Sequence, residues 1–507
     1  MSEESRHNAA SDQDATYDHV VKYIGLFGGV QGLNMLINIV RNKITASILG
    51  PSGIGLINIY NKVSGLISQA TNLGLSFSAV KHVAELSGTA DAKQRDRLID
   101  TVRMWCLVTA LVGLLVGLVL SPWLSWWTFR THDYTHTFLL LSLIVAMMAI
   151  TGGEMAILKG LKQLKKVALI SIFAAIATLL VCVPFYYIMG MKGIVSALIV
   201  SNAIVLGIHL YYSSKVAPWR RTIVSFSSIQ AGSPMVKLGI AYVFAGICGQ
   251  GGDYIIMAFI QNHGSLESVG LYNTGYFLAV GIGSMLFGAV EADFFPRLSA
   301  LVNDVKRANK TINRQIEVCV QFVTPCLILE VLAMPLIVRM LYTEEFSQAA
   351  SMAVCAIFFL FIRSFVLPVA YLPLAKGDSR TYLLTEILYD AFVAVAIPIA
   401  FVRYGLVGAG CALSLAALFE FLFIYVYYGV KYQFVWSMHL VWNYLFHFLL
   451  LGMCVAVTLL VSNALIRWGV GLFALIASAS LSYRVLSREV GVAGSIVEWV
   501  RHKLLKK

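Results

Sequence analysis

The sequence predicts an all-α polytopic membrane protein with about 14 transmembrane helices and both termini in the cytoplasm. Hydrophobic residues make up 59% of the 507 residues, charged residues 13%, and the mean hydropathy is +0.78. A soluble domain needs far more charge to cover its surface. Apolar stretches of 18 residues or more recur along the whole chain, each long enough to cross ~30 Å of hydrocarbon as a helix. The ~10-residue alternating segments of a membrane barrel are missing from the sequence.

Turn signals separate the apolar stretches. Glycine and proline end one helix and allow the next to begin at Gly50-Pro51, at residues 189–193 and at Tyr404-Gly405. The eight cysteines have no paired spacing and lie mostly inside apolar stretches, which predicts small buried side chains without a disulfide or a metal site. The predicted spans are residues 21–49, 54–78, 104–124, 137–158, 167–189, 193–213, 237–260, 269–295, 318–341, 349–374, 382–402, 407–429, 442–462 and 467–484.

Lysine and arginine set the predicted orientation. If the N-terminus is cytoplasmic, most of the 38 basic residues fall in inner loops and tails, and few fall in outer loops. The inner clusters lie in residues 93–97, 159–166, 220–221 and 297–314. The net charge of +12 is therefore a signal of topology, and it does not indicate nucleic-acid binding.

The first twelve predicted spans divide into two halves of six. Gly55-Leu56-Ile57-Asn58 opens the second span and Gly270-Leu271-Tyr272-Asn273 opens the eighth, a trace of internal repetition. Halves of six spans share one orientation, so an axis along the membrane normal would relate them. The predicted segments are 1–19, a disordered cytoplasmic tail; 20–213, the N-lobe; 214–236, a cytoplasmic linker; 237–430, the C-lobe; 431–484, two appended spans; and 485–507, a basic amphipathic cytoplasmic tail.

Polar side chains form a full-length stripe on each of the first two spans. The first stripe covers about 80° of arc and comprises Gln31, Asn34, Asn38, Arg41 and Thr45. The second covers about 100° and comprises Asn58, Asn61, Lys62, Gln69, Asn72 and Ser76. Neighbouring helices with such faces would not turn them to lipid, so we expect both to line a water-filled cavity.

Two cations lie on these stripes at similar depth. Arg41 comes nine residues before Gly50 and Lys62 nine residues after Gly53, so both would lie roughly 13 Å below the outer surface. Burying a cation at the helix centre costs ~2.5–3.5 kcal/mol, and neighbouring cations also repel each other. An anionic ligand would resolve both problems. The alternative is that both side chains pair with buried acids or extend to the surface.

The second half of the chain contributes further charged residues near mid-membrane, namely Asp253, Glu330, Arg363, Asp390 and Glu420. Arg363 is the best candidate to face Arg41 and Lys62 and to bind a phosphate through two parallel hydrogen bonds. A salt bridge to Glu330 or Glu420 is the alternative. Desolvated carboxylates titrate readily, so the four acids are candidates to couple transport to H⁺ or Na⁺, with an interhelical hydrogen bond as the alternative for each.

Catalytic and nucleotide-binding signatures are missing. The sequence has no Gly-rich phosphate loop followed by Lys-Ser/Thr, no HExxH and no GxSxG in a suitable context. The longest outer loop, about 124–136, is too short for a catalytic domain. No cofactor is expected, and energy would come from an ion gradient, the membrane potential or the substrate's own gradient. Glu154, near the inner end of the fourth span, is expected to pair with a loop lysine.

Two short motifs near the N-terminus carry a family resemblance. Residues 48–56 read Ile-Leu-Gly-Pro-Ser-Gly-Ile-Gly-Leu before the polar second span, and Leu73-Gly74-Leu75 runs into Val-Lys-His-Val-Ala at 80–84. Together they resemble the signature of Wzx-type O-antigen translocases, in the polysaccharide-flippase branch of the multidrug/oligosaccharidyl-lipid/polysaccharide (MOP) exporter superfamily. The Phe-Phe-Pro-Arg-Leu sequence at 294–298 is similar to the same branch. Many members have twelve spans, so the appended pair and the long N-terminal tail are departures.

The resemblance implies two six-helix lobes around a central cavity that opens alternately inward and outward. The cargo would be an oligosaccharide on polyprenyl diphosphate, moved to the outer leaflet of the bacterial inner membrane. Membrane lipids and polysaccharide assembly proteins would be its other partners. Cations suit the diphosphate and amides suit sugar hydroxyls, which gives the candidate substrate-binding residues Arg41, Lys62, Arg363, Asn34, Asn38, Asn58, Asn61 and Gln69.

Three other functions fit the sequence less well than a flippase. A drug/cation antiporter of the same superfamily would favour an acidic, aromatic cavity, whereas this sequence has three cations at mid-depth. An integral membrane glycan polymerase or ligase would need a large outer loop with catalytic Arg, His or Asp residues. A purely structural membrane protein would leave the polar stripes unexplained.

Overall fold

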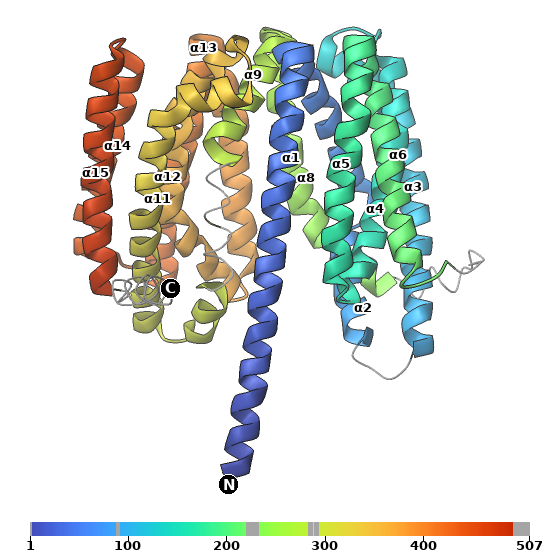
Figure 1. Ribbon diagram of the computed structural model, residues 1–507, viewed down its shortest axis with the longest axis horizontal. Helices are drawn as coiled ribbons and strands as arrows, with labels where there is room; N and C mark the ends of the chain where they lie inside the picture. Colours follow the sequence, from blue (N-terminus) through green and yellow to red (C-terminus); the bar gives the residue numbers. More distant parts are fainter. Residues whose placement is uncertain (1–2, 88–91, 220–232, 282–286, 288–293, 490–507) are drawn as a thin grey trace, which may run out of the picture. The chain divides into compact units, whose positions relative to one another are not determined.

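The computed structural model describes residues 3–87, 92–219, 233–281, 287 and 294–489 (Figure 1). Every secondary-structure element assigned in these ranges is helical, as predicted. The chain divides into two compact units, Met1–Tyr254 and Ile255–Lys507, and the boundary falls inside α8 (Ser233–His263). The predicted lobe boundaries at 213 and 237 stay a prediction, because most of the predicted linker lies outside the described residues.

The chain is a multi-pass membrane protein. Eight helical stretches of the described residues are long and apolar enough to cross a membrane. Two of them, Leu164–Ser214 with 51 residues and Ser379–Tyr432 with 54, have room for two crossings of ~20 residues each. The exact count of 14 spans and the orientation stay predictions. The eight cysteines, all within the described residues, are free thiols.

Glycines at the predicted turns break the long helices. α1 (Glu3–Thr71) is interrupted at Gly50, with φ 63° and ψ −170°, and α13 (Ser379–Tyr432) at Gly405, with φ 62° and ψ −147°. Gly190, with φ 55°, follows the last residue of α5 (Leu164–Met189) and begins the short 3₁₀ turn η1 (Gly190–Lys192). A positive φ is costly for any residue with a Cβ, so glycine marks all three predicted turns.

The N-terminal tail differs from the prediction. α1 begins at Glu3, so residues 3–19 are helical, whereas the sequence was expected to be disordered there. Residues 3–24 contain no glycine or proline, so a helix that forms in the first span can propagate backward by one hydrogen bond per residue. The basic tail predicted at 485–507 lies mostly outside the described residues, beyond the end of α15 (Ala464–Glu489).

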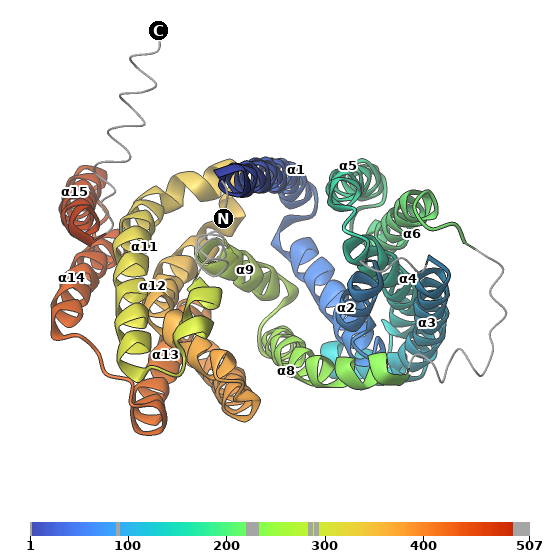
Figure 2. The same ribbon diagram turned by 90° about the horizontal axis from the view of Figure 1, so that it is seen from below.

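The first unit packs its helices through small residues. At Gly117 a Cβ would lie 2.6 Å from the Cβ of Ser142, and at Gly160 it would lie 2.6 Å from the Cβ of Val83. These glycines let neighbouring backbones approach closely, as in other membrane helix pairs. Figure 2 shows α3, α4 and α6 side by side in this unit. Its remaining elements are α2 (Leu75–Ser87), α3 (Ala92–Phe129), α4 (Thr135–Gly160) and α6 (Gly193–Ser214).

The second unit is built around α12 (Ser347–Ala375). In its apolar window 83% of the residues are buried, compared with 17% for α15, so α12 is the core helix and α15 faces outward. The predicted span 269–295 is not one regular helix. α9 (Leu266–Tyr276) continues as a π-helix, η2 (Phe277–Gly281). The remaining elements are α11 (Val305–Leu341), η3 (Glu344–Phe346), α13, α14 (Met438–Leu460) and α15.

A row of polar residues on one face of α11 holds the appended helices. The row comprises Asn309, Asn313, Glu317 and Gln321, spaced four residues apart on one helix face. Asn309 and Asn313 donate to the carbonyls of Gln433 and Val435, and Asn443 donates to Glu317. At the buried end, His447 Nε2 contacts Gln321 Oε1 at 2.8 Å and its Nδ1 contacts the Ser478 hydroxyl at 3.0 Å. A neutral imidazole protonated on Nε2 satisfies both contacts.

Candidate functional site

Side chains on the second arm of α1 (residues 51–71) contact α8 at successive helical turns. An ideal Cβ on Gly65 would lie 3.7 Å from Oε1 of Gln250. One turn along, a Cβ on Gly246 would overlap the amide of Gln69, so only glycine leaves the space that this amide fills. The α8 numbers fall as the α1 numbers rise, so the two helices run antiparallel here. Part of the second polar stripe therefore faces polar and glycine positions of α8.

An ion pair between α1 and α8 lies one turn away from Gly65 and Gln250, in the direction opposite to Gln69. Lys62 donates from Nζ to Asp253 Oδ2, and the two side chains are 31% and 45% exposed. Asp253 lies ten residues before His263, the last residue of α8, which is ~15 Å along the helix. Pairing with an unnamed acid is the alternative that the sequence leaves open for Lys62, and in the structure that acid is Asp253. Both charges keep an accessible surface, which a water-filled site requires at this depth.

Arg41 lies on the first arm of α1, on the predicted stripe. Its side chain is half-buried and lies within electrostatic range of the Tyr186 hydroxyl on α5. In the part of the chain that the structure describes, no carboxylate lies within 4.0 Å of the Arg41 guanidinium. A half-buried cation without an acidic partner is a candidate for binding an anion.

The amides of the predicted stripes lie in mixed surroundings. Asn34 and Asn38 are half-buried, and Oδ1 of Asn34 has no hydrogen-bond partner among the described residues. Asn58 donates to the Ile54 carbonyl at 2.9 Å, and Asn61 is exposed. The side chain of Gln31 lies outside the described residues. The amides therefore retain hydrogen-bonding capacity that hydroxyl-bearing ligands can use.

In the second unit, Arg363 forms the salt bridge that the sequence left open as an alternative. Its Nη1 donates to Glu420 Oε2 at 2.9 Å, and the two side chains are 26% and 4% exposed. The guanidinium also lies over the Tyr389 ring, 5.8 Å from the centroid. Among the described residues, this hydrogen bond occupies one of the five N–H donors of the guanidinium. Arg363 can therefore hold Glu420 and still donate to a second anion.

The other two candidate acids of this unit lie in different surroundings. Glu330 on α11 is 8% exposed, and its Oε1 has no hydrogen-bond partner among the described residues. Asp390 on α13 is half-buried. A buried carboxyl oxygen without a donor is unfavourable for an ionised carboxylate, so Glu330 is suited to bind a proton.

The expected partner of Glu154 is wrong. Glu154 does not pair with a loop lysine, but accepts from Nε and Nη2 of Arg103 on α3, at 2.9 and 3.1 Å. Both side chains are almost fully buried, at 1% and 2% exposed, and the Ser213 hydroxyl also donates to Glu154. The loop lysines lie beyond the helix ends, whereas Arg103 is one helix away and its planar guanidinium fits a carboxylate. The carbonyl of Ala217 accepts a further hydrogen bond from Nη2 of Arg103 at 2.8 Å.

Comparison with known proteins identifies the family. The family model described as "Polysaccharide biosynthesis protein" matches residues 44–351, more than half of the chain. The chain belongs to the polysaccharide biosynthesis protein family. No curated protein matches the sequence. The family match confirms the predicted resemblance to a polysaccharide family.

Solved structures share the fold of this family member at low sequence identity. The inward closed lipid II flippase MurJ has a TM-score of 0.68 and 14% identity, covering 91% of this chain and 99% of that chain. The inward-facing multidrug resistance MATE transporter has a TM-score of 0.63 and 15% identity, covering 78% of this chain and 95% of that chain. The outward-facing MATE transporter has a TM-score of 0.52 and 13% identity, covering 80% of this chain and 93% of that chain. At these identities the likeness shows the fold alone.

Several residues that lie beside the charged side chains of this family member were not predicted from its sequence. Gln250 and Gly246 lie beside the second arm of α1, and the run Gly246-Ile-Cys-Gly-Gln-Gly-Gly-Asp253 would have signalled a polar, closely approached stretch of α8. Tyr389 and Glu386 lie near the Arg363–Glu420 pair. No spacing rule connects them to Arg363, because they lie on another helix.

Proposed function

We propose that this chain is a flippase for a polyprenyl-diphosphate-linked oligosaccharide, an O-antigen or related surface-polysaccharide unit. It would move the lipid from the cytoplasmic to the periplasmic leaflet of the bacterial inner membrane by alternating access. The observation that carries the proposal is that α1 holds two partly exposed cations, Arg41 and Lys62, in a member of the polysaccharide biosynthesis family. The similarity to a protein described as a lipid II flippase supports the same kind of cargo.

The cations are proposed to bind the diphosphate. Arg41 has no carboxylate partner in the described chain, and Lys62 has one that is 45% exposed, so a diphosphate can approach both. Charge-assisted hydrogen bonds to phosphate are about twice as strong as neutral ones. The remaining donors of Arg363 make it the proposed phosphate contact of the second unit.

The amides are proposed to bind the glycan. Asn34 and Asn38 lie on the same stripe as Arg41, and Asn58, Asn61 and Gln69 lie on the stripe of Lys62. Sugar hydroxyls are both donors and acceptors, which matches an amide with one carbonyl oxygen and two N–H groups. The polyprenyl chain would remain in the bilayer, so these sites need to hold only the head of the lipid.

Asp253 is the proposed coupling residue of the first unit. While it is ionised it competes with the diphosphate for Lys62. A proton or Na⁺ bound to Asp253 would neutralise its charge and release Lys62 for the substrate. Glu330, Asp390 and Glu420 are the coupling candidates of the second unit, and Glu330 is the strongest of these, because its buried Oε1 has no hydrogen-bond partner among the described residues.

Depletion of the protein in its native host tests the proposed function. The expected result is accumulation of lipid-linked oligosaccharide on the cytoplasmic leaflet, measured by protection from a membrane-impermeant glycosidase in sealed spheroplasts. Restoration by the wild-type chain, but not by Lys62→Gln, would tie the defect to the site. Normal periplasmic delivery during depletion would contradict the flippase. A raised sensitivity to cationic drugs instead would favour the antiporter function.

A further inference from the structure

An apolar groove runs along the outer surface of the first unit, between α5 and α6. Its volume is about 600 Å³. The lining residues are Phe173, Ile176, Ala177, Leu180, Ile204, Gly207, Ile208, Tyr211 and Tyr212. At Gly207 a Cβ would meet nothing within 4 Å, so this glycine is not required by close packing and instead deepens the groove. The groove extends about eight residues along α6, or roughly 12 Å. That is most of one leaflet, since the full hydrocarbon core is ~30 Å thick.

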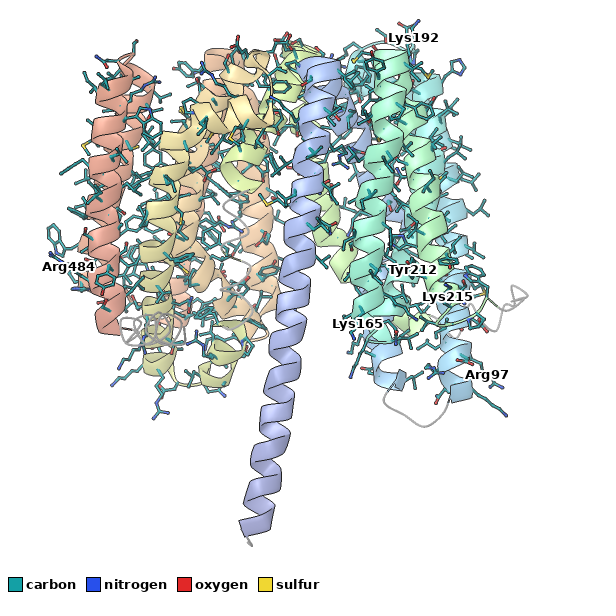
Figure 3. All side chains as sticks on the ribbon, in the orientation of Figure 1. Arg97, Lys165, Lys192, Tyr212, Lys215 and Arg484 are labelled. Carbon is teal, nitrogen blue, oxygen red and sulfur yellow. The ribbon has the colours of Figure 1, made fainter. Side chains whose placement is uncertain are left out.

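One end of the groove is aromatic and cationic. Phe173 and Tyr212 stack at 6.2 Å between ring centroids and form the floor at this end. Lys215 follows directly, with Nζ 2.6 Å from the Tyr211 hydroxyl and 4.1 Å from the centre of its ring. Figure 3 shows Tyr212, Lys215 and Lys165 at this end of the α5–α6 pair. Tyrosine beside lysine at the end of an apolar groove is the arrangement expected where hydrocarbon meets headgroups.

The opposite end of the same helix pair has an exposed cation that lies outside this groove. Lys192 lies in the turn that joins α5 and α6, as Figure 3 shows, and like Lys215 it is exposed. The groove lining ends at Leu180 and Ile204, short of this turn. Lys192 therefore serves as an internal control for any effect of positive charge alone.

We propose that the α5–α6 groove is a binding site for an anionic glycerophospholipid, with one acyl chain in the groove and the headgroup phosphate at Lys215. Of the lining residues only the two tyrosines carry a polar side-chain atom, so the groove offers few hydrogen bonds to a glycan. Its length matches a chain confined to one leaflet. Both features favour a bilayer phospholipid over the proposed oligosaccharide carrier. The exposed cation favours an anionic over a zwitterionic headgroup.

Photolabelling of the full-length protein in phosphatidylcholine nanodiscs tests the proposal. The two probes are phosphatidylglycerol and phosphatidylcholine with the same photoactivatable acyl chain, and mass spectrometry maps the labelled peptides. The phosphatidylglycerol probe should label residues 173–180 and 204–212 about fivefold more than the phosphatidylcholine probe. A factor of this size is what one cation near an anionic headgroup contributes to binding. Raising the salt from about 50 mM to about 500 mM should reduce this preference, because salt screens exposed charges.

Three variants separate the groove from the charge. Lys215→Gln should remove most of the preference for phosphatidylglycerol, whereas Lys192→Gln should leave it unchanged. Gly207→Leu should lower the labelling of the groove by both probes several-fold, because the added side chain occupies open space. Equal labelling by the two probes, a preference that survives Lys215→Gln, or groove labelling that survives Gly207→Leu would each overturn the proposal.

Discussion

The buried Arg103–Glu154 pair should be a main determinant of stability in the first unit. In Glu154→Gln the Arg103 guanidinium stays 2% exposed and loses its counter-charge. Removing one partner of a buried pair costs about 3–5 kcal/mol. We expect the lower end for Glu154→Gln, because glutamine keeps an acceptor. Arg103→Met should reach the upper end, because it leaves Glu154 unpaired and frees the carbonyls of Ala217 and Pro218.

Replacing both partners should cost less than Arg103→Met alone. Arg103→Met/Glu154→Met shares with Arg103→Met the loss of the donors to the Ala217 and Pro218 carbonyls, but it leaves no unpaired buried charge. The assay is thermal unfolding of the detergent-solubilised protein. The control is Glu85→Gln, which breaks an exposed pair with Lys81 at 4.0 Å and should change stability by less than about 0.5 kcal/mol. A double variant less stable than both single variants, or Glu154→Gln as mild as Glu85→Gln, would refute the reasoning.

Two further predictions concern the second unit. Lys431, Tyr432 and Thr381 donate to Asp378 and hold the pKa of its carboxyl below the ordinary value. A pKa lowered on folding stabilises the fold above the unfolded-state pKa of ~3.9, and this stability is lost as the pH falls through the folded-state pKa. Asp378→Asn should therefore melt below wild type at pH 7, with the gap closing below about pH 4; a gap independent of pH would contradict this. His447→Phe should loosen α14 and α15 from α11 by about 1–3 kcal/mol, because the Gln321 carbonyl and the Ser478 hydroxyl lose their shared partner. Faster proteolysis at residues 433–437 would show this loosening. The control Asn463→Ala, in the turn between α14 and α15, should leave the rate of proteolysis unchanged.

The sequence predicted the helices and their turns well, because these depend on local signals. Gly50 and Gly405 have the positive φ that ends one span and begins the next. The internal repeat also has a local counterpart. Asn58 and Asn273, at equivalent places in the two motifs, each donate to the carbonyl four residues earlier, at 2.9 and 2.8 Å.

The pairing of charges could not be predicted, because it depends on how distant helices meet. Lys62 and Asp253 are separated by 191 residues, and only the register of α8 against α1 brings them together. Glu154 shows the same limit: the nearest cations in sequence are lysines in the following loop, whereas its partner Arg103 is 51 residues away. A hydropathy profile fixes depth, but it does not fix which helix faces which.

Transport by variants of the first-unit cations tests the central account most directly. The measurement is the rate of lipid-linked oligosaccharide translocation, at matched expression, for Arg41→Gln, Lys62→Gln and Lys43→Gln. Lys43 is the control, because it lies about 200° round the helix from Arg41. We predict that Arg41→Gln and Lys62→Gln each lower the rate of translocation about tenfold or more, because each loses one charged hydrogen bond worth ~1.5 kcal/mol or more. The rate of Lys43→Gln should stay near that of the wild type. Wild-type rates in both Arg41→Gln and Lys62→Gln would contradict a cationic substrate site on α1.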